Sequence, residues 1–267
     1  MGGVLIAIPA RYASTRYPGK PLAELTGASG EAKSLIRRSW EAACAVDGVD
    51  RVVVATDDDR IRDASEALGA EVVMTSETCV NGTERCAEVM ETLAGGYDIV
   101  VNLQGDAPLT PPWFIEELIA GLRRDPIAEV ATPVLRCEGD MLKALKEDRA
   151  NGRVGGTTAV FTKDWHALYF SKEVIPFTSE TYADDAMTPV YHHVGVYAYR
   201  PSALASYPLW DMGELERLEG LEQLRFLERG RPVLCVEVEA RGRQFWELNN
   251  PEDIPRIEAM MAAMGMD

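Results

Sequence analysis

Short apolar runs that end at glycine, proline or aspartate alternate with amphipathic stretches along the first half of the chain. Apolar runs of this length, bounded by such residues, are typical of buried strands, and apolar residues at helical spacing predict helices. The predicted strands are 4–9, 51–56, 71–74, 98–104 and 129–136, and the predicted helices are 34–46, 57–68, one capped by Thr83, and 113–122. Strands that alternate with helices predict a parallel sheet with right-handed crossovers.

The regular alternation ends after about Cys137. Residues 152–169 carry short runs of β-branched and aromatic residues, and 190–199 reads as one strand, so we expect antiparallel pairs in a smaller second lobe. The pattern then predicts a helix at 220–229, a strand at 232–239 and a closing helix at 251–264. Asn250 and Pro251 suit the start of that closing helix. We therefore expect one domain over 1–267, with the main sheet in about 1–137 and 220–267 and the lobe in about 138–219.

Composition narrows the class of partner. The chain has 267 residues, of which 46% are hydrophobic and 26% charged, as in ordinary soluble proteins. Its net charge of −16 repels nucleic acid and anionic membranes, so neither is expected as a partner. No secretory leader or membrane-length apolar run is evident. Five cysteines, with no C-x-x-C spacing, disfavour a disulfide framework or a zinc site and favour a reducing cytoplasm.

A basic loop follows the first predicted strand, in the sequence VLIAIPARYASTRYPGK at 4–20. Ligands bind beyond the carboxyl ends of strands in such sheets, so the loop is expected on the ligand side. Its three cations, Arg11, Arg16 and Lys20, together with the hydroxyls of Ser14 and Thr15, suit a polyphosphate. The alternative is a solvated basic loop, although positive charge concentrated in an acidic chain favours the binding site.

Polar residues also follow the fourth predicted strand and precede the third predicted helix. Gln104 and Asp106 end the strand, and Asn81, Gly82, Thr83 and Arg85 lie before or within the first turn of the helix. A carboxylate that faces phosphates needs a cation between them, and Mg²⁺ prefers one or two carboxylates plus phosphate oxygens. The residues thus predict a magnesium-dependent enzyme that uses a nucleoside triphosphate, with an ordinary turn role for Asp106 as the alternative. Neither a Walker A sequence nor G-x-G-x-x-G follows the first strand.

Six further motifs, in order, resemble those of the 3-deoxy-manno-octulosonate (Kdo) cytidylyltransferase family. They are NGTER at 81–85, VVNLQGDAPL at 100–109, ALYFSKEVIP at 167–176, HVGVYAYR at 193–200, LEQLRFLERG at 221–230 and NPED at 250–253. The resemblance implies an α/β fold of the nucleotide-diphospho-sugar transferase type. That fold is a Rossmann-like, mainly parallel sheet flanked by helices, with a small antiparallel second lobe. It also implies a homodimer formed through this lobe.

The resemblance implies a role for each candidate site residue. The anomeric hydroxyl of the sugar acid would attack the α-phosphorus of CTP in line, and pyrophosphate would leave. Catalysis is expected from Arg11, Lys20 and Asp106. The implied nucleotide contacts are Ala10, Arg11, Ser14, Lys20, Asn81, Gly82, Thr83, Arg85 and Gln104; the sugar contacts are Gln104, His193, Tyr197, Glu222 and Gln223; and the Mg²⁺ ligands are Asp106 and Asn249. The alternatives are a core position for His193 and Tyr197 and, for Glu222, a surface ion pair with Arg225 or Arg229.

Several positions depart from the family pattern. Asn249 stands where the family carries a second magnesium aspartate, and an amide oxygen can ligate the ion without supplying charge. Segment 151–161 lacks the lysine expected there, Lys172 replaces an arginine and Asn81 replaces a serine. Three hypotheses follow: a cytidylyltransferase for Kdo, the same reaction on 8-amino-Kdo or a nonulosonate, and a non-catalytic nucleotide-binding relative.

Overall fold

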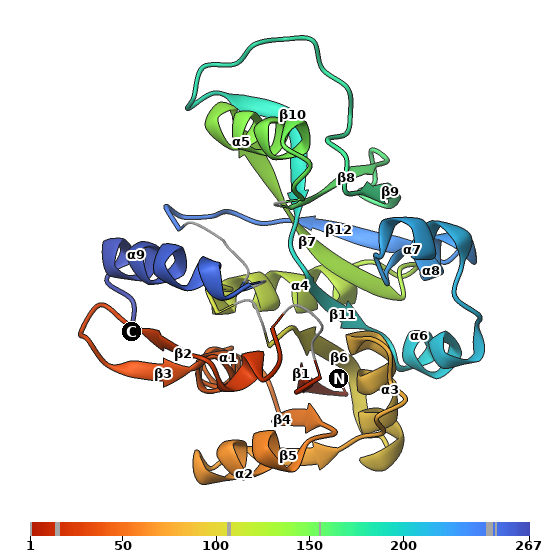
Figure 1. Ribbon diagram of the computed structural model, residues 1–267. Helices are drawn as coiled ribbons and strands as arrows, with labels where there is room; N and C mark the ends of the chain where they lie inside the picture. Colours follow the sequence, from red (N-terminus) through yellow and green to blue (C-terminus); the bar gives the residue numbers. More distant parts are fainter. Residues whose placement is uncertain (1, 14–16, 106–107, 155, 244–247, 249) are drawn as a thin grey trace. The chain divides into compact units, whose positions relative to one another are not determined.

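The computed structural model describes residues 2–13, 17–105, 108–154, 156–243, 248 and 250–267 (Figure 1). The chain forms two compact units. The first unit joins Met1–Glu116, Tyr199–Ala205 and Ala240–Asp267, and the second joins Glu117–Ala198 and Ser206–Glu239. No helix in the described part of the chain is both long and apolar enough to cross a bilayer.

The first unit contains a parallel sheet whose strands end at one edge. Its order is β5 (Glu71–Met74), β4 (Arg51–Thr56), β1 (Gly3–Ala10) and β6 (Tyr97–Leu103), all parallel, which confirms the predicted parallel sheet. The register aligns Ala10 with Thr56 and Thr56 with Met74. Val4 to Ile8 are fully buried, so the apolar run forms the centre of the sheet as its composition requires.

This unit also contains four whole helices and parts of two others. The whole helices are α1 (Leu35–Cys44), α2 (Asp59–Ala67), α3 (Gly82–Thr92) and α9 (Ile254–Met264), and the parts are the start of α4 (Pro112–Arg124) and most of α6 (Pro201–Ser206).

The prediction that Thr83 caps α3 is wrong. Asn81 is the cap, because its side-chain oxygen accepts the Glu84 backbone N–H at 2.9 Å. Thr83 is instead buried, with its hydroxyl 2.7 Å from the Tyr199 hydroxyl.

The predicted start of the closing helix is also revised. A short 3-10 turn, η3 (Pro251–Asp253), precedes α9. Asn250 caps this turn as predicted, and its backbone N–H donates to the Asp253 carboxylate at 2.7 Å. These two residues form a reciprocal capping pair that satisfies backbone donors at the start of the turn.

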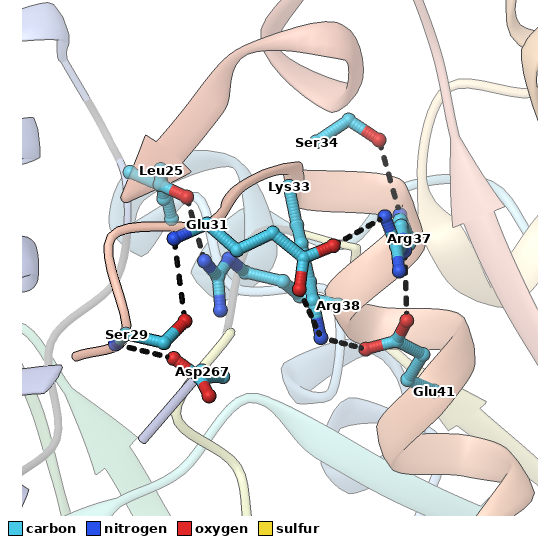
Figure 2. A network of polar contacts seen from close by, with 9 residues as sticks. All are labelled: Leu25, Ser29, Glu31, Lys33, Ser34, Arg37, Arg38, Glu41 and Asp267. Atoms are coloured by element: carbon cyan, nitrogen blue, oxygen red, sulfur yellow. Dashed lines mark hydrogen bonds and ion pairs between the residues drawn. The ribbon is translucent and has the colours of Figure 1, made fainter. Parts of the chain in front are cut away.

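A small hairpin of β2 (Glu24–Thr26) and β3 (Ala32–Ser34) follows the basic loop and the 3-10 turn η1 (Lys20–Leu22). Figure 2 shows how side chains from α1 and from the last residue hold it. Arg38 of α1 is buried and donates to the Leu25 carbonyl at 2.6 Å. The Asp267 carboxylate accepts the Ser29 backbone N–H at 2.7 Å. The segment after the basic loop is therefore tied both to α1 and to the region beyond α9.

The second unit is built on β7 (Val130–Glu138). This strand pairs antiparallel with β10 (Met187–His193), which pairs with β8 (Thr157–Phe161), which in turn pairs with β9 (Ala167–Ser171). These pairs confirm the antiparallel strands predicted from composition. Strand β12 (Val233–Glu237) runs parallel to β7. Four further elements complete the unit: α5 (Gly139–Ala150), η2 (Tyr207–Leu209), α7 (Glu214–Glu219) and α8 (Leu224–Glu228).

The prediction of a single strand at 190–199 is wrong, because strand β10 ends at His193. Strand β11 (Val196–Tyr199) begins only after a tight turn. In that turn the Val194 N–H donates to the Pro133 carbonyl at 3.1 Å and the Val196 N–H donates to the Val194 carbonyl at 2.8 Å. These bonds replace ladder bonds, so residues 193 and 197 no longer follow the simple alternation of one strand.

The helix predicted at 220–229 is shorter than expected. Gly220, with φ 62°, ends α7 in the left-handed region, and α8 starts only at Leu224. Arg225 is buried and forms a bidentate ion pair with the buried Glu216, at 2.6 and 2.8 Å. The bidentate partner of this guanidinium is therefore Glu216, from the preceding helix.

Candidate active site

The basic loop doubles back on itself at the carboxyl edge of the parallel sheet. The Gly19 N–H donates to the Tyr12 carbonyl at 2.9 Å, and Gly19 has φ 72°. A Cβ at Gly19 would lie 3.0 Å from the Tyr12 ring, so both conformation and space favour glycine here. Arg11 is exposed directly after β1, and Lys20 is half-buried at the start of η1. The predicted contacts Ser14, Thr15 and Arg16 lie outside the described residues.

The start of α3 packs directly against the end of β6. A Cβ built on Gly82 would lie 2.8 Å from both Asn102 Nδ2 and Gln104 Nε2. Asn102 is fully buried, and neither of its amide atoms has a hydrogen-bond partner in the described part of the chain. The structure therefore brings two predicted nucleotide contacts, Gly82 and Gln104, together. It adds Asn102, which the sequence analysis did not single out although it lies within the QGD motif region.

Arg85 links α3 to two strand ends. Its guanidinium is buried and bonds both the Asp57 carboxylate, at 3.1 Å, and the Thr75 hydroxyl. Asp57 follows β4 and Thr75 follows β5, so the side chain crosses the edge at which the predicted ligand binds. The direct contact of Arg85 with nucleotide stays a prediction, and its contacts with Asp57 and Thr75 identify it as a group that orders this edge.

Apolar packing joins three segments that the sequence analysis placed around the phosphates. Leu109 and Leu248 belong to one buried cluster in the first unit, and the partly buried Tyr17 of the basic loop packs against it. Leu109 follows the predicted metal ligand Asp106 by three residues, and Leu248 precedes Asn249 directly. Asp106 and Asn249 themselves lie outside the described residues. Within the residues that are described, no group of three or more histidine, cysteine, aspartate or glutamate side chains could hold a metal.

Four of the predicted sugar contacts, which are His193, Tyr197, Glu222 and Gln223, lie in the second unit, whereas the fifth, Gln104, lies in the first. His193 is hydrogen-bonded to Thr132. The His193 Nε2 is 2.9 Å from the Thr132 hydroxyl, which also lies 3.2 Å from the Val194 carbonyl and 2.9 Å from the Val196 carbonyl. A hydroxyl has one proton, and the two carbonyls can only accept. When the Thr132 hydroxyl donates to one of these carbonyls, His193 Nε2 donates to the hydroxyl, which leaves Nδ1 with the lone pair.

Burial keeps the His193 ring neutral. The residue is 5% exposed, and loss of solvation lowers its pKa to about 3, with a smaller contribution from neighbouring His192. Phe170 packs edge-on at a ring distance of 4.9 Å, and Tyr197 lies at 5.7 Å. A neutral imidazole of this tautomer can accept a hydrogen bond from a hydroxyl group at Nδ1, but it does not supply positive charge.

Tyr197 and Gln223 extend the same group. The Tyr197 hydroxyl donates to Gln223 Oε1 at 3.0 Å. Gln223 is 1% exposed, and its Nε2 has no partner among the described residues. Glu222 is half-buried, and its backbone carbonyl accepts the Tyr207 hydroxyl at 3.1 Å. A buried amide donor without a partner costs free energy unless a ligand or water satisfies it, so the Gln223 amide is a strong candidate contact.

The structure thus gathers His193, Tyr197 and Gln223 in one unit, as their shared predicted role requires. Thr132 and Phe170 complete the group, and sequence reasoning missed both. Thr132 lies inside an apolar strand, where no motif points to a ligand. Phe170 lies within the motif ALYFSKEVIP at 167–176, but the sequence analysis assigned it no role. Their contacts with His193, a hydrogen bond with Thr132 and an edge-on ring contact with Phe170, show that they belong to the group.

Comparison with known proteins gives one consistent result. Residues 5–238 match the family model described as cytidylyltransferase. A 3-deoxy-manno-octulosonate cytidylyltransferase from Maricaulis maris is 47% identical over 262 residues, covering 98% of each chain. An 8-amino-3,8-dideoxy-manno-octulosonate cytidylyltransferase from Shewanella sediminis is 40% identical and covers 97% of this chain and 98% of its own.

The fold agrees with these sequences. A solved structure of a CMP:2-keto-3-deoxy-manno-octonic acid synthetase complexed with CTP matches with a TM-score of 0.81 and 34% identity. The match covers 98% of this chain and 99% of that one. These comparisons confirm the family resemblance and the α/β fold predicted from the sequence.

Proposed function

Because the chain belongs to the 3-deoxy-manno-octulosonate cytidylyltransferase family, we propose that it transfers CMP from CTP to Kdo and releases pyrophosphate. The observation that carries this proposal is the 47% identity to a relative of that name over nearly the whole of both chains. Two groups of residues support the proposal. One lies at the edge of the parallel sheet and consists of Gly82, Arg85 and Gln104. The other lies in the second unit and consists of His193, Tyr197 and Gln223.

The basic loop and α3 would bind the nucleotide. Arg11 and Lys20 supply positive charge at the carboxyl edge of the parallel sheet, where the triphosphate is expected. Gln104, held against Gly82, would contact the cytidine together with Asn81 and Arg85. The Asp57 and Thr75 contacts of Arg85 keep this edge in one arrangement, so binding costs less conformational entropy.

The second unit would bind the sugar acid. His193, neutral and with its Nδ1 lone pair free of the Thr132 contact, would accept a hydrogen bond from a sugar hydroxyl. The Gln223 amide and Glu222 would contact further hydroxyls, and Tyr197 would hold the Gln223 side chain in position. These polar groups orient the acid so that its anomeric hydroxyl can attack the α-phosphorus in line.

We also propose Mg²⁺ as the cofactor. An Asp106 carboxylate and an Asn249 amide oxygen, beside a triphosphate, form an oxygen donor set of the kind this ion prefers. The common packing of Tyr17, Leu109 and Leu248 supports it, because the segments next to both residues meet at the basic loop. The bound ion would neutralise charge on the phosphates, and Asp106 and Asn249 would hold it.

Two assembly and location proposals accompany the function. The second unit exposes the large apolar side chains of Leu168 and Phe177, at 62% and 89%, which supports a homodimer. A mass measurement in solution that gives only the monomer would overturn the homodimer.

All five cysteines are free, which supports the proposal that the protein works in a reducing cytoplasm.

The decisive test is pyrophosphate release by the purified protein with CTP, Mg²⁺ and Kdo, with UTP and ATP as controls. We expect release that requires CTP and Kdo together. Asp106→Asn should abolish it, whereas Asp164→Asn, which changes an exposed aspartate, should not. Absence of release with Kdo would refute the proposal, and absence of release with 8-amino-Kdo and a nonulosonate as well would favour a non-catalytic nucleotide-binding relative.

A second candidate substrate is 8-amino-Kdo or a nonulosonate. Two observations favour such a substrate. The chain is 40% identical to a relative named for 8-amino-3,8-dideoxy-manno-octulosonate, and Asn249 replaces the expected aspartate. Competition between the two octulosonates for limiting enzyme separates the candidates. A large preference for Kdo would remove the second.

A further inference from the structure

Two arginines lie over the same indole ring in the first unit. The guanidinium carbons of Arg241 and Arg243 are 4.9 and 4.7 Å from the Trp113 ring centroid. Arg241 is exposed and Arg243 is half-buried. In the described part of the chain neither guanidinium forms an ion pair or a side-chain hydrogen bond. Among the described residues, two like charges are therefore held together with no carboxylate paired to either guanidinium.

The backbone that presents them is also unusual. The Arg243 N–H donates to the Ala240 carbonyl at 2.9 Å, and the two central residues, Arg241 and Gly242, have φ of 50° and 78°. Two consecutive left-handed residues define a tight turn in which arginine is disfavoured. Strained conformations of this kind persist where the surroundings impose them, and they concentrate at functional sites.

As far as the described residues show, contact with the ring leaves the hydrogen-bonding capacity of both arginines available. A guanidinium that lies over an aromatic face keeps its N–H donors directed outward, and its planar fork matches phosphate geometry. The ring contact also restrains the side chains, which lowers the entropy lost when an anion binds. The chain carries a net charge of −16, so two adjacent arginines with no ion-pair partner among the described residues concentrate positive charge that suits an anionic ligand.

We propose that Arg241, Arg243 and Trp113 form a binding site for a phosphoryl oxyanion. Its charge would neutralise both guanidiniums, and the first turn of α4, which contains Trp113, adds its positive dipole end. The source is either the pyrophosphate portion of the nucleotide, which rests on the proposed function, or free phosphate from solution. The packing near the basic loop agrees with the nucleotide as the source. Leu109 is close in sequence to Trp113 and Leu248 to Arg243, and both leucines pack with Tyr17 of the basic loop.

The test uses the full-length protein labelled with ¹⁵N at its tryptophan indoles. The Trp113 resonance is assigned by its loss in Trp113→Phe, and inorganic pyrophosphate is titrated without nucleotide. We expect the Trp113 N–H to shift in a saturable manner. The Arg241→Gln/Arg243→Gln double variant should weaken this response by about tenfold or more, since it removes charge-assisted hydrogen bonds.

One control variant and one alternative variant accompany this titration. Arg229→Gln removes an exposed arginine of the second unit and should leave the Trp113 response unchanged. If the double variant does not fold, Arg241→Lys/Arg243→Lys retains the charges but loses the planar fork, and it should still bind pyrophosphate measurably more weakly than wild type.

Parallel titrations identify the source. A Trp113 shift with CTP that saturates together with nucleotide binding assigns the site to the substrate, and a shift with inorganic phosphate but none with CTP assigns it to free phosphate. The inference is overturned if no phosphoryl compound moves the resonance, or if the response is the same in the arginine variants. The pyrophosphate titration needs no turnover, so it still decides the inference if the proposed reaction fails.

Discussion

Gly82→Ala places one methyl group at the point where α3 meets β6. The new Cβ would lie 2.8 Å from Asn102 Nδ2 and 2.8 Å from Gln104 Nε2, and 3.4 Å from Asn102 Oδ1. Carbon and nitrogen atoms do not approach as closely as 2.8 Å without a hydrogen bond, so at least one amide must move. Asn102 is fully buried within β6, whereas Gln104 is half-buried just beyond the strand end, so Gln104 moves more readily.

Two effects on stability oppose each other. Gly82 is the first residue of α3 and does not have a positive φ, so alanine can adopt its conformation and gains up to about 1 kcal/mol of helix propensity. Forcing extra volume into a packed site costs about 1–3 kcal/mol. We therefore expect a net loss in the free energy of unfolding of about 0–2 kcal/mol, small enough for the variant to fold.

The larger expected effect is on nucleotide binding. If displaced Gln104 loses one neutral hydrogen bond to the nucleotide, worth about 0.5–1.5 kcal/mol, the KM for CTP should rise about 2- to 10-fold. The KM for the sugar acid through His193 and Gln223 should change less. The measurement is pyrophosphate release at varied CTP and varied Kdo, together with urea denaturation of the same preparations.

A double-mutant cycle tests the cause. Asn102→Ala removes the amide that prevents relaxation, so combining it with Gly82→Ala should recover part of the lost stability, with a coupling energy of about 0.5–3 kcal/mol. Strict additivity of the two substitutions, or a Gly82→Ala enzyme with unchanged KM for CTP, would refute the reasoning.

Three further predictions concern the second unit. Tyr197→Phe removes the donor to Gln223 and should raise the KM for the sugar acid several-fold while costing about 0.5–1.5 kcal/mol of stability, measured by kinetics and urea denaturation. Glu216→Gln leaves the buried Arg225 charge uncompensated and should lower the free energy of unfolding by about 3–5 kcal/mol in urea. The pKa of His193 is about 3 in the folded chain and 6.5 in the unfolded chain, so on acidification the unfolded chain binds a proton that the folded chain does not. The free energy of unfolding should therefore fall by about 2–3 kcal/mol between about pH 6.5 and pH 4.5. His193→Gln should reduce this dependence of stability on pH.

Two of these predictions have a contrasting control variant. Tyr182→Phe changes a tyrosine whose hydroxyl bonds exposed groups and should leave the KM unchanged. Glu71→Gln breaks the exposed pair with Arg51 and should cost less than about 1 kcal/mol. A stability loss for Glu216→Gln no larger than that of Glu71→Gln would contradict the importance assigned to burial. Equal pH slopes in wild type and His193→Gln would contradict the histidine linkage.

Local pattern predicted the elements of the first unit well. The runs at 4–9 and 51–56 are continuous and apolar because both faces of a parallel sheet are covered, so their strands follow from composition. The cap of α3 was misplaced because threonine and asparagine both suit a cap. The outcome depended on burial, since Thr83 found a tertiary partner in Tyr199 while Asn81 remained near the helix end.

The second unit was harder to predict for a physical reason. The run at 190–199 keeps strand-like composition through Val194 and Gly195, yet the hydrogen bond from Val194 to Pro133 turns the chain there. Helix α5 (Gly139–Ala150) was not predicted, because its charged residues give it only a narrow apolar face, of which Leu142 and Leu145 are buried. In both cases the deciding interactions join residues that lie far apart in sequence.

The sequence by itself determined the residue types of the candidate site and their order along the chain. The cations of the basic loop, Gln104 and His193 could be named because motifs and strand ends are local properties. Only the tertiary structure decided the neighbours of these residues: Asn102 against Gly82, Asp57 on Arg85, and Thr132 on His193. Protonation, tautomer and orientation follow from burial and hydrogen-bond partners, and these exist only once distant strands are paired.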